Sequence, residues 1–181
     1  MADPQYVEVL DTIDRIQVVT YRLGITLCGL ALLLPAIDQF YTGVLSYFQP
    51  ALMLGSIAVA ASLHIYSKTV RYALAHATWL ALILFACSTY FDWPIHQGWV
   101  NGLLLITMSG IAFKEHFCFK IPGLKYTPVL LLMATLAQLA ERTHLFVGAS
   151  LIAAILILFM AGAKWRMPLH FDIGDKRNYQ Q

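Results

Sequence analysis

The residues of this chain that could take part in chemistry are concentrated in one short segment, residues 114–120. It reads Lys-Glu-His-Phe-Cys-Phe-Lys and follows a long apolar run. If the segment is helical, Lys114 and Cys118 share a face at four residues apart, and Glu115 meets Cys118 at three. Basic neighbours favour the thiolate form of a cysteine, so this spacing predicts a reactive Cys118.

His64 lies at the end of an earlier apolar run and could sit at the same depth as this segment. Glu115, His116, Cys118 and His64 together offer the ligand types of a zinc site, but their spacing matches no established metal motif. We therefore assign no metal and no catalytic residue, and leave a cofactor unassigned. The candidate collar consists of Lys114, Glu115, His116, Cys118 and His64.

An alternative interpretation is that the candidate collar only anchors a helix end at the membrane surface. Glu115 would then pair with a neighbouring lysine, and Cys118 would merely pack. Anchoring needs only one or two bases, however, and gains nothing obvious from Glu115 or Cys118. We therefore expect any specific activity of the protein to depend on the candidate collar.

The remaining sequence offers few catalytic signals. It contains no glycine-rich phosphate loop, no Gly-x-Ser-x-Gly and no His-Glu-x-x-His. Three cysteines cannot form a disulfide scaffold, and Cys28 and Cys87 lie within apolar runs. These features favour a protein that is not an enzyme.

Three further polar residues fall inside apolar runs: His76, Gln138 and Asn101. Polar groups inside a bilayer are costly unless they are paired, so each is a candidate for a buried contact. His76 is the most deeply placed titratable group. We expect it to face the bundle interior with a hydrogen-bond partner.

The composition indicates a membrane protein. Of the 181 residues, 59% are hydrophobic and 12% are charged, and the mean hydropathy is +0.67. A soluble domain has about twice this share of charged residues. A net charge of +2 also excludes a nucleic-acid-binding protein with an extended basic face.

The apolar runs between charges predict an all-α, polytopic membrane helix bundle. A helix needs about 20 mostly apolar residues to cross the hydrocarbon layer. The first and fifth apolar runs are short, and we expect each to lengthen because the side chain of Arg22 or Lys125 at its edge can snorkel toward the headgroups. Pro122 and Pro128 weaken the prediction of the fifth span. The chain is then one domain, residues 1–181, with six spans at about 18–37, 47–66, 71–91, 95–113, 121–140 and 143–163.

The distribution of basic residues predicts the orientation. With six spans, eleven of the twelve Lys and Arg residues fall on one side, and Arg142 alone falls on the other. Basic residues are enriched in cytoplasmic segments, so both termini are expected in the cytoplasm. Tyr6, Leu10, Ile13 and Gln17 follow a helical spacing that suits a short interfacial helix before the first span; a frayed tail is the alternative.

A resemblance to a known family comes from the run between Gly110 and Phe119, which contains Phe-Lys-Glu followed by Phe-Cys-Phe. With Thr127-Pro128 after it, this run resembles a bacterial family of integral membrane proteins known as domain of unknown function 2301. Residues 21–24 and 63–66 are similar to it too. The resemblance implies a small multi-span protein of the bacterial inner membrane, and it brings no activity, cofactor or catalytic residue.

Two functions remain. The first is a membrane-embedded binding, scaffold or assembly protein that works through its helix faces and the candidate collar. The alternative is a small transporter or channel subunit, which would need an oligomer because six short helices leave little room for a pore. The expected partners are the lipid bilayer and a second copy or a larger membrane complex, and not nucleic acid.

Overall fold

The computed structural model describes residues 9–174 as a bundle of α-helices with two short 3-10 turns and no strands in this range. The elements are α1 (Thr12–Ala31), α2 (Leu34–Ile37), η1 (Val44–Tyr47), α3 (Phe48–Ala61), α4 (Lys68–Tyr90), α5 (Gln97–Phe119), η2 (Leu124–Tyr126), α6 (Thr127–Leu139), α7 (Thr143–Trp165) and α8 (His170–Ile173).

The first helix begins earlier than expected. Asp11 caps α1, because its carboxylate accepts a hydrogen bond from the Asp14 backbone N–H at 2.7 Å. The carboxylate of Asp14 in turn accepts a hydrogen bond from the Asp11 backbone N–H. From this cap α1 continues without a break to Ala31. Residues 12–17 are therefore the first turns of α1 and not a separate interfacial helix; Tyr6 lies outside the described residues.

Within the described residues, five helical segments are long and apolar enough to cross a membrane: Thr12–Ile37, Val44–Ala61, Lys68–Tyr90, Gln97–Phe119 and Thr143–Trp165. This confirms the all-helical membrane architecture. The fifth expected span, at about 121–140, contains only the shorter apolar helix Leu124–Leu139. Its α6 portion rises about 20 Å, against a hydrocarbon core about 30 Å thick. The second expected span ends early, because α3 stops at Ala61 and residues 62–67 form a loop.

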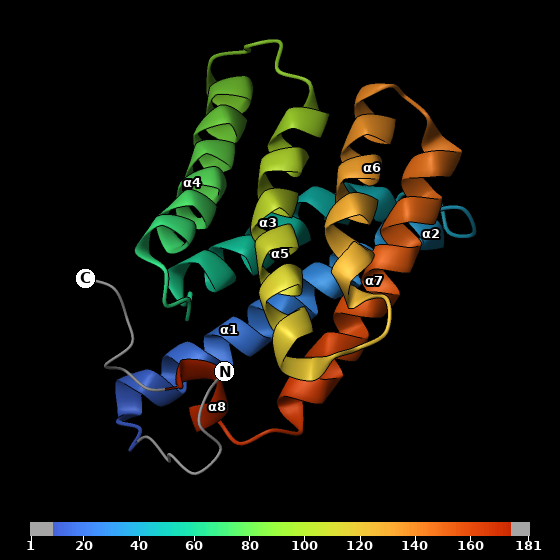
Figure 1. Ribbon diagram of the computed structural model, residues 1–181. Helices are drawn as coiled ribbons and strands as arrows, with labels where there is room; N and C mark the ends of the chain where they lie inside the picture. The colour runs from blue at the N-terminus through green and yellow to red at the C-terminus, as the bar shows by residue number, and fades with distance from the viewer. Residues whose placement is uncertain (1–8, 175–181) are drawn as a thin grey trace.

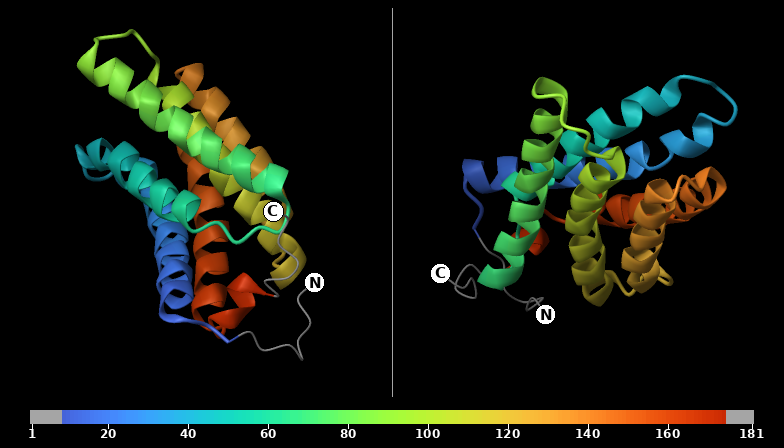
Figure 2. Two further views of the ribbon diagram at one scale, coloured as in Figure 1. Left: turned by 90° about the vertical axis from the view of Figure 1, so that its left-hand side faces the viewer. Right: turned by 90° about the horizontal axis from the view of Figure 1, so that it is seen from above.

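Helix α5 has a central position, because it packs against α3, α4, α6 and α7. Figure 1 shows α4 beside α5 at one edge of the bundle, and α6 beside α7 at the other. Helix α1 packs between α3 and α7. In the side view of Figure 2, α1 and α7 run next to each other, and the short red α8 folds back near their ends.

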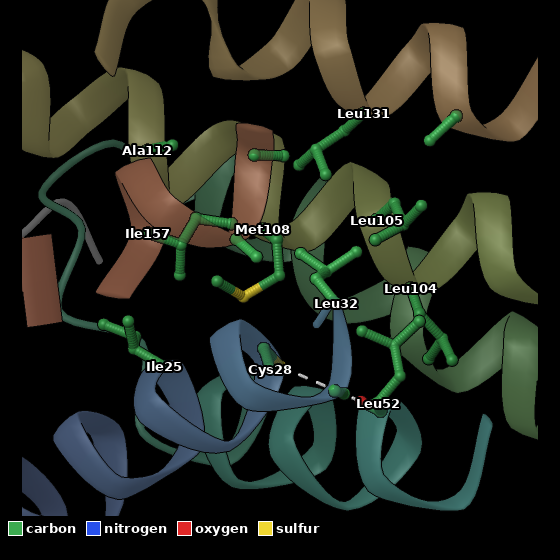
Figure 3. Packing of buried hydrophobic residues seen from close by; sticks show 14 of the residues in the cluster. Ile25, Cys28, Leu32, Leu52, Leu104, Leu105, Met108, Ala112, Leu131 and Ile157 are labelled. Carbon is green, nitrogen blue, oxygen red and sulfur yellow. Dashed lines mark hydrogen bonds between the residues drawn. The ribbon is translucent and has the colours of Figure 1, made fainter. Parts of the chain in front are cut away.

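The apolar core lies where α1, α3, α5, α6 and α7 meet, and Figure 3 shows Ile25, Leu52, Met108, Leu131 and Ile157 converging there. Two glycines bring α1 and α3 close together. A Cβ added at Gly24 would lie 2.7 Å from the Gly55 carbonyl oxygen, so that contact requires glycine. The same seam places Cys28 Sγ 3.8 Å from the Leu52 carbonyl oxygen.

Candidate functional site

Five charged side chains meet at one end of the bundle, and we call them the charged cluster: Arg22, Lys114, Glu115, Lys164 and Asp172. They come from α1, α5, α7 and α8. Lys164 Nζ lies 3.1 Å from Glu115 Oε1, and Lys114 Nζ lies 3.3 Å from the same oxygen. Asp172 pairs with both Arg22 and Lys164.

Arg22 points into the protein, although it was expected to snorkel toward the lipid headgroups. Its side chain is 2% exposed. The guanidinium donates from Nε to Asp172 Oδ2 at 2.7 Å, and to the carbonyl oxygens of Met167 and Pro168 at 2.8 and 3.1 Å. These partners belong to the segment that follows α7, so Arg22 holds this segment and α8 against α1.

Tyr21 occupies the middle of the charged cluster. Its hydroxyl donates a hydrogen bond to Glu115 Oε1 at 3.1 Å. The ammonium groups of Lys164 and Lys114 lie 5.1 and 5.9 Å from the centre of its ring. Such cation–π contacts stabilise ammonium groups that have left water. The ring of His64 meets Tyr21 edge-on, at 5.7 Å between centroids.

The loop 62–67 closes the side of the charged cluster. Lys114 Nζ donates to the His64 carbonyl oxygen at 2.6 Å, and Arg71 donates to the next carbonyl, Ile65, at 3.0 Å. His64 itself is buried, and its Nδ1 has no hydrogen-bond partner within the described residues. Burial, and then the positive charge of Lys114, lowers the pKa of His64 from 6.5 to about 4.

The charged cluster is not neutral. In the described part of the chain it joins three cations to two carboxylates, which leaves one positive charge in excess. Arg22, Glu115, Lys164 and Asp172 are nearly sealed, with side chains 0–2% exposed, whereas the side chain of Lys114 is 28% exposed. The excess charge is therefore accessible only at Lys114.

The structure brings together part of the candidate collar. Lys114, Glu115 and His64 meet at the charged cluster. Cys118 is exposed on the outside of α5, and the ring of His116 lies against Phe117 at 5.6 Å. Within residues 9–174, no three His, Cys, Asp or Glu side chains are grouped so that they could hold a metal ion. The four zinc-type ligand residues therefore do not converge.

Of the three polar residues expected to make buried contacts, Asn101 and Gln138 do so and His76 does not. Asn101 is buried and donates from Nδ2 to Gln138 Oε1 at 3.2 Å, which joins α5 to α6; Gln138 itself is half-buried. The expectation that His76 faces the bundle interior is wrong, although the ring does have a hydrogen-bond partner. It lies on the exposed face of α4, and its Nδ1 is 2.6 Å from the Tyr72 carbonyl oxygen of its own helix.

Sequence reasoning missed four members of the site: Tyr21, Arg22, Lys164 and Asp172. One signal was present for Arg22 and Lys164. Each is a basic residue inside or at the end of an apolar helix, where an ionisable group usually has a partner. No local pattern marks Asp172, because it lies in a polar tail.

Comparison with known proteins supports the expected family. The sequence model of the family described as "Uncharacterized integral membrane protein (DUF2301)" matches residues 60–180. The chain belongs to the DUF2301 family. This DUF2301 chain is also 35% identical over 180 residues to an "Uncharacterized protein" of Haemophilus influenzae (strain ATCC 51907 / DSM 11121 / KW20 / Rd), covering 99% of both chains. No solved structure matches the chain.

Three of the segments that carried the resemblance, residues 21–24, 63–66 and 110–119, meet in space in this DUF2301 protein. Tyr21 and Arg22, the loop residue His64, and Lys114 with Glu115 all contribute to the charged cluster or border it. Residues 60–180 include His64, Lys114, Glu115, Lys164 and Asp172, whereas Tyr21 and Arg22 precede them.

Proposed function

We propose that this DUF2301 protein is a bacterial inner-membrane protein with both termini in the cytoplasm that works as a membrane-embedded binding or scaffold protein through its cytoplasmic end. The observation that supports this role is the charged cluster. It ties α1, α5, α7 and α8 together at one end of the bundle, through residues up to 150 positions apart.

We infer that the buried ion pairs fix the arrangement of the helices, rather than adding to the free energy of unfolding. Removing charges from water is costly, and apolar side chains of equal size often stabilise a fold as well. A chain with only 12% charged residues nevertheless places five of them in one cluster. We infer that the cluster holds the surface formed by Lys114, Phe117 and Cys118 in a defined shape for a ligand or partner.

Transport is the second candidate. Polar contacts inside the spans support it: Thr78 lies 2.8 Å from Thr107 between α4 and α5, and Asn101 binds Gln138 between α5 and α6. Transporters often carry polar groups near the midplane. Such contacts equally join neighbouring helices, so we rank transport below binding.

Complementation of a deletion strain tests the main proposal. Cys118→Ser changes the exposed surface of α5 beside the cluster, and His116→Ala changes a half-buried ring next to Phe117. Neither residue contributes to an ion pair of the cluster. We expect both variants to reach the membrane at wild-type levels but to rescue the deletion phenotype poorly. Lys125→Gln, an exposed lysine next to Tyr126, is the matched control and should rescue fully. Full rescue by both collar variants would contradict the proposal.

A flux measurement separates the two candidates. The purified protein is reconstituted into vesicles that contain a pH-sensitive dye, and proton and ion leakage is compared with that of empty vesicles. A binding or scaffold protein leaves the leakage unchanged. Leakage that rises with the amount of protein, and falls with Thr107→Val, would instead favour the transporter.

A further inference from the structure

We propose that the corner between the end of α5, the start of α4 and the loop 62–67 binds the phosphodiester of a membrane phospholipid, with Lys114, Arg71 and His64 as its polar wall. This inference deepens the proposed function by naming a ligand class for the same end of the protein, and it rests on that function only in placing this end at the headgroup level.

Two cations converge on this corner from different helices. Lys114 and Arg71 donate to the neighbouring carbonyl oxygens of His64 and Ile65, at 2.6 and 3.0 Å. The close packing of α4 on α5 permits this arrangement, because a Cβ added at Gly110 would lie 2.6 Å from Leu74 Cδ1. Paired Lys and Arg side chains on two helices are typical of sites that bind phosphate groups.

The charge of the neighbouring cluster favours an anion here. Three cations face two carboxylates, and Lys114 is the member that reaches the surface. A phosphodiester carries one negative charge, so a single bound phospholipid would neutralise the excess. One bound anion is sufficient, because Arg22 and Lys164 are already paired with Asp172.

His64 adds a polar atom without a partner. It is buried beside Tyr21, and its Nδ1 has no hydrogen bond in the described structure. Buried polar atoms are almost always paired, so an orphan of this kind calls for a partner from outside the chain. A neutral imidazole can donate from Nδ1 to a phosphate oxygen.

The surface next to Lys114 fits a lipid better than a free ion. Phe117 follows Lys114 by three residues and shares its face of α5. Phe113 and Phe117 are both exposed and contact each other edge to face, at 5.2 Å between centroids. An acyl chain would cover this aromatic pair while its phosphate reached Lys114. Inorganic phosphate would leave the pair exposed.

Native mass spectrometry of the detergent-purified full chain tests the site, with phosphatidylglycerol added in mixed micelles. We expect the wild type to retain a single phospholipid. Lys114→Gln should weaken retention about tenfold or more, since it removes one charge-assisted hydrogen bond. Lys114→Arg should restore retention, which would show that loss in the Gln variant is not a folding defect. Lys125→Gln is the control lysine and should bind as the wild type does.

Further arms distinguish a lipid from free phosphate. Phe117→Ala should reduce phosphatidylglycerol retention, and an excess of inorganic phosphate should not displace the lipid. Displacement by phosphate, with no effect of Phe117→Ala, would overturn the lipid assignment in favour of a free anion. Equal retention by Lys114→Gln and wild type would overturn the site altogether. Neither result bears on the proposed function, which the complementation test with His116→Ala and Cys118→Ser decides independently.

Discussion

The hydroxyl of Tyr21 donates a hydrogen bond to Glu115 Oε1 at 3.1 Å, although the two residues are 94 positions apart in the chain. This bond joins α1 to α5 at the centre of the charged cluster. Glu115 also receives the ammonium groups of Lys114 and Lys164, so Tyr21 is the uncharged donor in a site otherwise made of ion pairs.

Tyr21→Phe should lower the stability of the protein, because it removes one hydrogen bond to a buried carboxylate and keeps the ring. A bond of that kind contributes about 1.5–3 kcal/mol. Thermal unfolding in detergent should show a lower Tm. Tyr126→Phe changes an exposed tyrosine and should leave the Tm unchanged. Equal Tm values for Tyr21→Phe and wild type would show that the hydroxyl does not stabilise the fold.

The Arg22–Asp172 pair should behave as one unit. Asp172→Asn removes the carboxylate that pairs with buried Arg22 and one of the two that pair with buried Lys164. Loss of one member of a buried pair costs about 3–5 kcal/mol. Adding Arg22→Gln should restore part of that loss, so the double variant is more stable than the sum of the single changes predicts. Strictly additive effects in chemical unfolding would contradict the coupling.

Stability should depend on pH through His64, whose pKa falls from 6.5 to about 4 in the folded protein. Between these values the unfolded chain binds a proton that the folded chain does not. Stability is therefore greatest above about pH 6.5, decreases by up to about 3 kcal/mol as the pH falls to about 4, and changes no further through this group.

The Tm measured from pH 4 to pH 8 in wild type and in His64→Gln checks this dependence. The variant should lose much of the slope between pH 4 and pH 6.5. His144→Gln, which changes an exposed histidine, should keep the wild-type slope. If the slope persists in His64→Gln, another group is responsible for the acid sensitivity.

The three cysteines should react with a maleimide in an order that follows their exposure. Cys118 is exposed, Cys87 is half-buried and Cys28 is buried. An impermeant maleimide should label Cys118 in inside-out vesicles and not in intact spheroplasts, because we expect this end of α5 in the cytoplasm. Cys118→Ser should abolish that label. Labelling of Cys118 from the outside would reverse the proposed orientation.

Reporter fusions should establish the topology. A reporter after Gln181 and a reporter inserted within residues 92–97 should report opposite sides of the membrane. A third reporter, within residues 140–142, tests the short α6. If α6 crosses, this reporter agrees with the one at residues 92–97; agreement with the reporter after Gln181 would reduce the number of spans and contradict the six-span layout.

The sequence by itself determined the helical membrane architecture, because a bilayer demands about 20 apolar residues without charge and the chain shows such runs plainly. It also singled out Lys114, Glu115 and His64, since polar residues are conspicuous at the end of an apolar helix. Residues 110–119 further indicated the family, which the match over residues 60–180 confirms.

Only the tertiary structure decided which of these residues meet. Periodicity gives the face of a helix on which a residue lies, but the neighbouring helix decides whether that face is covered. His76 was misplaced for this reason: α5 covers the Leu74 and Thr78 side of α4 and leaves His76 exposed. Arg22 turned inward because Asp172, 150 residues later, returns to meet it. A contact over that distance depends on how the helices pack, and no local pattern of residues specifies it.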